Sequence, residues 1–261
     1  MKKITKILAL ATALTISAGM TVQPSAAQSK PTVVLVHGAF AESSSWDGVI
    51  AELGRDGYTA VAAANPLRSV ASDAASVAAV VRSISGPVIL VGHSYGGPVV
   101  TEAANDSPNV KALVYVAAFA PDNGESSLSL SAKFPGSTLA NAIVPVERPD
   151  GKRDLFIERG KFHAQFAADV PEEKADLMAA TQRPVTEAAL AEPSGEPAWR
   201  KLPSYWIYGS EDRNIPPAVM RFMADRAHSA KTVVIDGASH ALMVSHPHEV
   251  AAVIEEAATR Q

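Results

Sequence analysis

The sequence contains no cysteine among its 261 residues, and this absence narrows the chemistry open to the chain. Disulfide bonds, thiol catalysis and cysteine-ligated metal sites are all excluded. The chain also lacks the His-Glu-x-x-His pattern of zinc-binding helices, and no Gly-x-Gly-x-x-Gly phosphate loop follows its first apolar strand. We therefore expect a protein that works without a metal ion or a cofactor.

Positive charge is also scarce. The chain has 23 Lys and Arg residues against 27 Asp and Glu residues, a formal net charge of −4. Without the three lysines of residues 1–27, 20 basic and 27 acidic residues remain, which gives −7. Because such a surface repels phosphate backbones, we expect no nucleic-acid partner. The length and the hydrophobic fraction of 47% are typical of one soluble globular domain.

The apolar run nearest to a membrane span stands at the start of the chain and is shorter than a full span. Residues 1–6 are basic, residues 7–22 are mostly apolar, and small residues at Ser25 and Ala27 follow. This layout is typical of a secretory signal peptide cleaved after Ala27. An uncleaved anchor is the alternative, disfavoured by the Thr, Ser and Gly residues within the run. We expect an exported protein, periplasmic or extracellular, with its domain over residues 28–261 and no membrane association after cleavage.

Short apolar runs alternate with amphipathic segments along most of the remaining chain. This rhythm predicts βαβ units, and hence an α/β domain with a mostly parallel sheet of about six strands flanked by helices. The expected strands lie within residues 32–37, 58–63, 87–91, 110–118, 203–208 and 232–235.

The alternation stops between Asp122 and about Arg200, where the chain is polar and rich in Pro and Gly. Helical pieces are expected near residues 155–166, 171–181 and 186–191, and no strong strand signal is present. Eighty residues are too many for a structureless loop, so we expect an inserted helical cap over the end of the sheet. Its aromatic residues either line an apolar pocket or form the core of the cap, which we favour for most of them; they are Phe134, Phe156, Phe162, Phe166 and Trp199.

A buried apolar strand leads directly into the segment Gly92 to Gly96, which reads Gly-His-Ser-Tyr-Gly. The G-x-S-x-G pattern between a strand and a helix is typical of a nucleophile elbow, a sharp turn that exposes the serine hydroxyl. The flanking glycines leave room for the turn, and the helix that follows directs backbone N–H groups towards the serine. We therefore expect Ser94 to be a nucleophile.

Two partners for Ser94 follow the last two strands. Asp212 and His240 each stand just beyond a predicted parallel strand, and parallel strands end at one edge of the sheet. His240 would accept the serine proton and return it to the leaving group, while Asp212 would orient the imidazole. Glu211 and Asp122 are the alternatives for the acid, and we favour Asp212 from its place in the turn.

An oxyanion hole needs two fixed N–H donors. The backbone of Tyr95, the residue after the nucleophile, supplies one. The loop after Gly38 supplies the other, from Ala39 or, as the alternative, from Phe40. We also expect Phe40 and Tyr95 to contact the substrate.

Four motifs together resemble the α/β-hydrolase superfamily: His-Gly-Ala at 37–39, Gly-His-Ser-Tyr-Gly-Gly at 92–97, Gly-Ser-Glu-Asp at 209–212 and Gly-Ala-Ser-His at 237–240. Within it, Trp46 after His-Gly-Ala and the segment ending in Phe-Ala-Pro-Asp at Asp122 are similar to the branch of methyl esterases and hydroxynitrile lyases. The resemblance implies a cofactor-free serine esterase with a compact helical cap.

Hydrolysis of a small carboxylic ester through an acyl-enzyme is therefore the leading hypothesis. Hydroxynitrile lyases of this branch carry a lysine directly after the catalytic histidine, where this chain has Ala241. Lyase, perhydrolase or haloperoxidase chemistry on the same residues is the first alternative. The second is a receptor-like protein that binds a ligand and turns over slowly.

Overall fold

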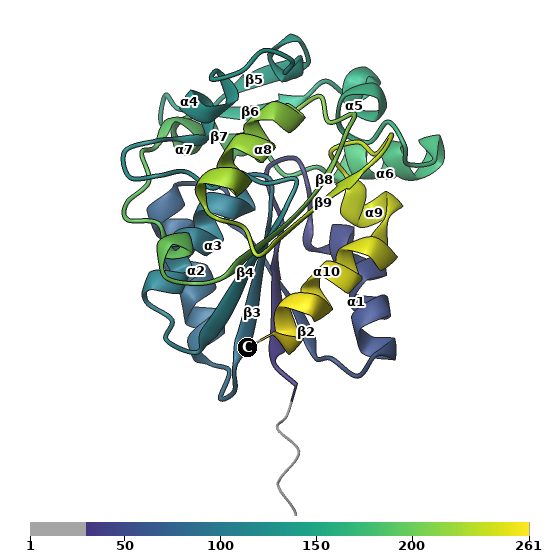
Figure 1. The fold of residues 1–261 in the computed structure, drawn as a ribbon. Helices are drawn as coiled ribbons and strands as arrows, with labels where there is room; N and C mark the ends of the chain where they lie inside the picture. Colours follow the sequence, from purple (N-terminus) through teal and green to yellow (C-terminus); the bar gives the residue numbers. More distant parts are fainter. Residues whose placement is uncertain (1–29, 261) are drawn as a thin grey trace, which may run out of the picture.

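A parallel sheet of six strands, in the order β2-β1-β3-β4-β8-β9, forms the centre of the molecule (Figure 1). The computed structural model describes residues 30–260, so the expected signal peptide lies outside the described residues. The strands are β1 (Thr32–Val36), β2 (Ala60–Ala63), β3 (Val88–His93), β4 (Val110–Val116), β8 (Ser204–Gly209) and β9 (Lys231–Ile235). Every neighbouring pair is parallel, which confirms the predicted sheet.

The burial of each strand explains its composition. All six residues of β3 are buried, because β1 and β4 pair with its two edges and helices cover its faces. A strand in this position is apolar without alternation. At the edge of the sheet, β9 leaves Thr232 and Val234 exposed, so its pattern is weaker.

Helices cover both faces of the sheet (Figure 1). On one face α2 packs against α3, and on the other α1 packs against α10. Helix α8 packs against β8. The helices are α1 (Asp47–Arg55), α2 (Val70–Arg82), α3 (Gly96–Asn105), α8 (Pro217–Arg226), α9 (Leu242–Ser245) and α10 (Pro247–Thr259), with the single turn η1 (Ser43–Trp46) before α1.

Between β4 and β8 the chain forms a cap over the carboxyl end of the sheet (Figure 1). Its helical parts are α4 (Ser127–Ser131), η2 (Leu139–Asn141), α5 (Arg159–Phe166), α6 (Glu172–Thr181), α7 (Glu187–Ala191) and η3 (Ala198–Arg200). The cap also holds a three-stranded antiparallel sheet of β5 (Ile143–Glu147), β6 (Arg153–Ile157) and β7 (Val185–Thr186).

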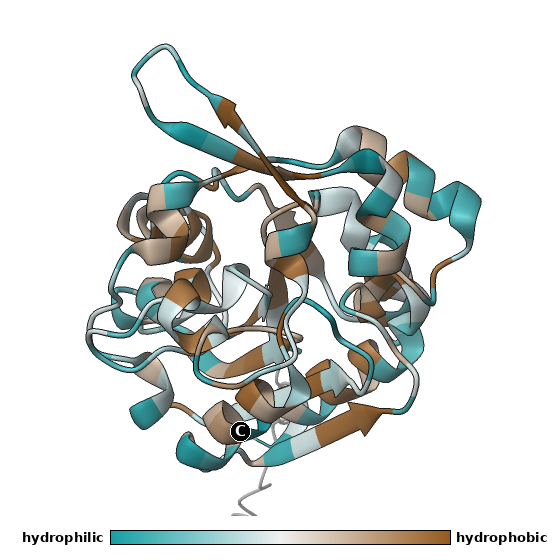
Figure 2. Ribbon diagram, turned by 90° about the horizontal axis from the view of Figure 1, so that it is seen from above, coloured by the Kyte–Doolittle hydropathy of each residue, from teal (hydrophilic) through white to brown (hydrophobic). Residues whose placement is uncertain are grey.

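The prediction of a cap without strands was therefore wrong, and residues 155–157 belong to β6 rather than to a helix. Most of β5 is exposed, so its sequence does not show the apolar alternation of a half-buried strand. The β5–β6 hairpin extends beyond the body of the molecule (Figure 2). Gly151 occupies a left-handed conformation in its turn, with φ of 75°. The residues of β5 form a strand because they pair with β6, and the hydrophobic pattern of β5 alone does not predict this pairing.

Polar contacts fasten the cap to the sheet domain beside α2. The Arg68 guanidinium donates to Asp154 Oδ1 at 2.7 Å and to the Pro184 carbonyl at 3.2 Å. The Glu192 carboxylate accepts the Val70 N–H, at the first turn of α2, at 2.7 Å. A carboxylate at a helix N-terminus is stabilised by the unpaired N–H groups and the helix dipole. These contacts hold the cap in one position on the domain.

Aromatic residues form much of the interior of the cap. Phe162 and Phe166 have no exposed surface, and their ring centroids are 5.0 Å apart. Trp199 is also buried, and its indole N–H donates to the Pro121 carbonyl at 3.1 Å. Phe162 and Phe166 thus pack within the cap, as favoured, whereas Trp199 packs against Pro121 and Arg226 at the boundary with the sheet domain.

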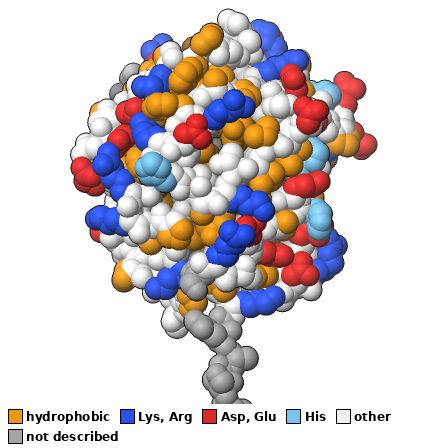
Figure 3. Space-filling view, viewed as in Figure 1, with side chains coloured by type: hydrophobic (Ala, Val, Ile, Leu, Met, Phe, Trp, Pro, Cys, Tyr) orange, Lys and Arg blue, Asp and Glu red, His pale blue; other side chains and the backbone are white. Residues whose placement is uncertain are grey.

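Acidic and basic side chains are interspersed over the surface drawn in Figure 3. Many form ion pairs, such as Arg153 with Glu187 at 2.5 Å and Arg200 with Asp122 at 2.7 Å. Exposed pairs of this kind each contribute at most about 1 kcal/mol. Within residues 30–260, no helix is long and apolar enough to cross a membrane.

Close backbone packing at the start of α3 makes Gly97 irreplaceable. A Cβ atom there would lie 1.9 Å from the Phe119 carbonyl oxygen. We predict that Gly97→Ala lowers the free energy of unfolding by about 3 kcal/mol, since the segment after β4 would have to move. Gly54, in α1, is the matched control because its Cβ would meet nothing within 4 Å. Gly54→Ala should raise stability by about 0.5–1 kcal/mol. Urea unfolding of both variants tests this, and equal effects would contradict it.

Candidate active site

Ser94 stands in a strained turn between β3 and α3. Its φ is 54°, in the left-handed region that non-glycine residues rarely adopt and that costs about 1–3 kcal/mol. The turn is possible because its neighbours lack side chains. A Cβ on Gly92 would lie 2.7 Å from the Gly96 carbonyl oxygen, and one on Gly96 would lie 2.6 Å from the Val36 oxygen. This is the backbone geometry expected of a nucleophile elbow.

The structure brings Asp212 and His240 together at the ends of β8 and β9. The imidazole Nδ1 lies 2.6 Å from Asp212 Oδ2, and both side chains are buried. The other carboxylate oxygen accepts the N–H groups of Asn214 and Ile215 at 2.8 and 2.9 Å. Because Nδ1–H donates to the carboxylate, Nε2 is left as a proton acceptor.

The two alternative acids lie elsewhere. Glu211 is exposed, and Asp122 forms an ion pair with Arg200 on the surface. The Arg200 guanidinium hydrogen bonds lower the pKa of Asp122 against the opposing effect of partial burial. Asp212 is therefore the acid that contacts the histidine.

His93 connects the elbow to the histidine loop. It directly precedes Ser94, and its Nε2–H donates to the His240 carbonyl at 3.1 Å. Burial first, and the neighbouring His240 second, hold the pKa of His93 well below its usual value. The ring is therefore neutral, and it packs on His240 with ring centroids 4.7 Å apart. Phe166 from the cap packs edge-on against the same imidazole at 5.0 Å.

The loop after β1 packs tightly against the elbow. A Cβ on Gly38 would lie 2.6 Å from Ser94 Cβ, so only glycine permits this approach. The Phe40 N–H donates to the Arg183 carbonyl at 2.9 Å and is not free. Within the described residues, the N–H groups of Ala39 and Tyr95 have no acceptor. Of the candidate oxyanion donors, Ala39 and Tyr95 are thus the two that are available.

His37 fixes the orientation of the Ala39 amide. The Asn65 N–H can only donate, and it lies 3.1 Å from His37 Nε2, so Nδ1 carries the proton. Nδ1–H therefore donates to the Gly38 carbonyl at 2.9 Å. In a trans peptide the C=O and the next N–H point in opposite directions, so this bond also sets the direction of the Ala39 N–H. Burial, the largest effect, lowers the pKa of His37 to about 4.

A cavity of about 500 Å³ opens at Ser94 beneath the cap. Phe40 and Tyr95, which were expected to contact the substrate, are both part of its wall. The Tyr95 hydroxyl itself donates to the buried Asp73 carboxylate at 3.0 Å and is not free. The lining contains no charged side chain; besides Ala39, Phe40, Ser94 and Tyr95, it consists of Phe119, Ser127, Leu128, Ser131, Leu139, Leu190, Asn214 and Ile215.

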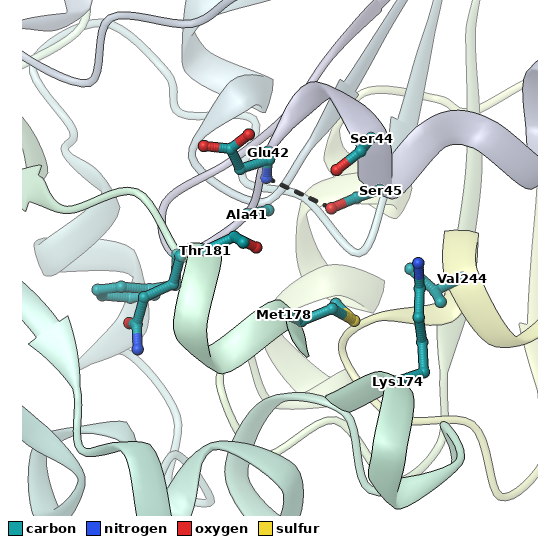
Figure 4. Close-up of a pocket in the computed structure, with 10 residues that line it drawn as sticks. Ala41, Glu42, Ser44, Ser45, Lys174, Met178, Thr181 and Val244 are labelled. Atoms are coloured by element: carbon teal, nitrogen blue, oxygen red, sulfur yellow. Dashed lines mark hydrogen bonds between the residues drawn. The ribbon is translucent and has the colours of Figure 1, made fainter. Parts of the chain in front are cut away.

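A second, smaller cavity lies beside the same loop (Figure 4). Glu42 and Ser45 line one side of it and Lys174 and Met178 of α6 line another, and the Glu42 N–H donates to Ser45 Oγ at 3.3 Å. Neither Ser94 nor His240 is part of its wall. Of these two cavities, the larger one is the one that has Ser94 in its wall.

Sequence reasoning missed three residues that shape the site. Asn65 and Asp73 bind His37 and Tyr95, and Asn214 contributes to both the acid loop and the cavity wall. Asn65 stands in an Asn-Pro turn and Asp73 in the first turn of α2, where polar residues are common. The local sequence offers no signal that would have separated these roles from ordinary turn and cap positions.

Comparisons with known proteins agree with the fold. A model of the Alpha/beta hydrolase family matches residues 33–253. The chain is 28% identical to an alpha-hydroxynitrile lyase of Arabidopsis thaliana over 172 residues, covering 62% of this chain and 67% of the relative. It is 28% identical to a pimeloyl-[acyl-carrier protein] methyl ester esterase of Xanthomonas campestris over 197 residues, covering 67% and 72%. The crystal structure of polyneuridine aldehyde esterase superimposes with a TM-score of 0.75 at 20% identity, covering 87% of this chain and 98% of that one.

The neutral His37 makes stability sensitive to acid. Its pKa is about 4 in the folded chain and 6.5 as a free side chain, so between these values the unfolded chain binds the extra proton. The neutral His37 imidazole makes its full contribution to the free energy of unfolding above pH 6.5. About 3 kcal/mol of this contribution is lost as the pH falls towards 4. We predict that His37→Gln shows a shallower loss of unfolding free energy than the parent between pH 6.5 and 4. His248→Gln, at an exposed imidazole, is the control for removing a histidine from the chain. If the unfolding free energies of the parent and His37→Gln fell equally with pH, the assignment of a neutral, buried His37 would be refuted.

Proposed function

Because the chain belongs to the α/β hydrolase family, we propose that it is a serine hydrolase that cleaves a neutral carboxylic ester through an acyl-enzyme. The observation that carries this proposal is the buried Asp212–His240 pair. His93, the residue before Ser94, holds this pair beside the elbow through its hydrogen bond to the His240 carbonyl. Two free N–H groups on the adjoining loop and elbow add the oxyanion donors.

The proposed reaction proceeds in two halves. Ser94 Oγ attacks the ester carbonyl while His240 Nε2 takes the hydroxyl proton, and the Ala39 and Tyr95 N–H groups stabilise the oxyanion. Collapse breaks the bond to the alcohol oxygen, which leaves with the proton from His240. Water then attacks the acyl-enzyme with His240 again as base, and the acid product and free Ser94 are released.

The uncharged wall of the cavity supports a neutral substrate. Every lining side chain is apolar, a hydroxyl or an amide. A carboxylate or ammonium group on the substrate would lose its hydration there without gaining a counter-ion, which costs several kcal/mol. Esters of modest size and little charge fit this environment best.

The chain is 28% identical to the lyase and 28% identical to the esterase, so sequence identity does not separate the two activities. The residues of the site provide the distinction. Cyanide release calls for a cation near the catalytic histidine. The next residue is Ala241, which is fully buried, and no charged side chain is part of the cavity wall. These features favour hydrolysis.

Replacement of the nucleophile provides the direct test. We predict that Ser94→Ala reduces kcat/KM for p-nitrophenyl butyrate by at least about 10³-fold, since the acyl-enzyme cannot form. Ser83→Ala, at an exposed serine at the end of α2, should match the parent. A fluorophosphonate should label the parent at Ser94, as located by mass spectrometry. Activity that survives Ser94→Ala, or a parent that releases only one equivalent of p-nitrophenol, would refute a hydrolase.

Export is a further part of the proposal and rests on the sequence of residues 1–27. We predict that the chain, expressed in a Gram-negative host, is recovered from the periplasm or medium with Gln28 as its first residue. N-terminal sequencing of the secreted and cell-bound fractions measures this. A protein that keeps Met1 and sediments with the membranes would support the anchor instead.

A further inference from the structure

Three polar residues of the cavity wall take no part in the proposed chemistry: Ser127, Ser131 and Asn214. Of these, Asn214 alone carries an amide, and its loop also holds the acid. Its side chain is 3% exposed, and it stands two residues after the acid Asp212. Its Nδ2 group has no hydrogen-bond partner in the described chain, although its Oδ1 has one. A buried amide nitrogen without a partner is costly, so it points to a partner that arrives with the substrate.

The network around Asn214 identifies which end of the amide is unpaired. Gln165 donates to the Arg213 carbonyl at 3.0 Å, and a carbonyl can only accept, so this atom is Nε2. The same Nε2 lies 2.8 Å from the Asn214 side chain, which must therefore present its oxygen. Thr138 donates to Gln165 Oε1 at 2.8 Å and fixes the glutamine in this orientation. The Nδ2 group of Asn214 is thus directed away from Gln165.

The position of Asn214 is rigid as well. Its N–H donates to Asp212 Oδ1 at 2.8 Å, and its carbonyl accepts the Ser137 hydroxyl at 2.9 Å. With the Gln165 contact, the residue is held from both the acid loop and the cap. A donor fixed in advance discriminates strongly, because a substrate without an acceptor leaves it unpaired.

We propose that Asn214 Nδ2 donates a hydrogen bond to a second oxygen of the substrate, so that the preferred esters carry a keto, ether or similar acceptor besides the scissile group. Asn214 is in this view a specificity-determining residue of the site. The inference rests on the proposed ester hydrolysis. The acyl-enzyme chemistry itself does not involve the Asn214 side chain, and its backbone bond to Asp212 is independent of side-chain replacement.

Matched esters that differ by one acceptor test the proposal. The acyl pairs are p-nitrophenyl methoxyacetate against butyrate and 4-oxopentanoate against 4-methylpentanoate, and the alcohol pair is 2-methoxyethyl acetate against butyl acetate. Each ratio of kcat/KM values is divided by the ratio of hydroxide-catalysed rates, which removes differences in intrinsic reactivity. We expect the parent to prefer the acceptor-bearing ester of at least one pair by about tenfold or more.

Two variants locate the source of this preference. Asn214→Leu keeps the size of the side chain, and Asn214→Ala removes most of it. In both variants the normalised ratio of kcat/KM values should fall to near one, even if kcat/KM changes for both esters of a pair. Asn141→Leu, at an exposed asparagine of the cap, should keep the parental ratio. A parent without preference in any pair, or a preference that survives in a folded Asn214 variant, would overturn the inference. A parent that hydrolyses no ester would instead refute the proposed function on which it rests.

Discussion

The close approach of three backbone segments around Ser94 is the constraint on which the site depends. The loop after β1, the elbow and the segment after β4 meet with no room for side chains at Gly38, Gly96 and Gly97. This packing holds Ser94 in a left-handed conformation that an isolated turn would not keep. The strain is maintained because β3, the strand that leads into the turn, is buried along its whole length. The available amides of Ala39 and Tyr95 are a direct result of the same contact.

Much of this arrangement is predictable from the sequence because its causes are local. Continuous apolar runs define buried parallel strands, and parallel strands end at one edge. Ser94, Asp212 and His240 each follow such a run, and their positions at this edge did not depend on the details of packing. The family resemblance, drawn from four short motifs, is confirmed by the match over residues 33–253. The choice of Asp212 over Glu211 also agrees with the observed contact to His240.

The remainder depends on contacts between distant segments. The exposed strand β5 is defined by its pairing with β6, and its own residues carry no strand alternation. The Phe40 amide is occupied only because Arg183, from the cap, places a carbonyl against it. His37 acquires its tautomer from Asn65, which follows the next strand. The two side-chain and amide contacts join residues that are 28 and 143 positions apart in sequence, and no periodic pattern records which pairs will meet.

The cap contacts the candidate active site through two neighbouring residues of α5, Gln165 and Phe166. Gln165 in α5 orients the Asn214 amide, while the Asn214 backbone binds the carboxylate that orients His240. Phe166, the next residue of α5, packs edge-on against the same imidazole. A change in the cap at this helix therefore alters the histidine and the polar wall of the cavity together. Because the bond to Asp212 comes from the backbone N–H of residue 214, a change of this side chain alters the cavity wall and leaves the support of the acid in place.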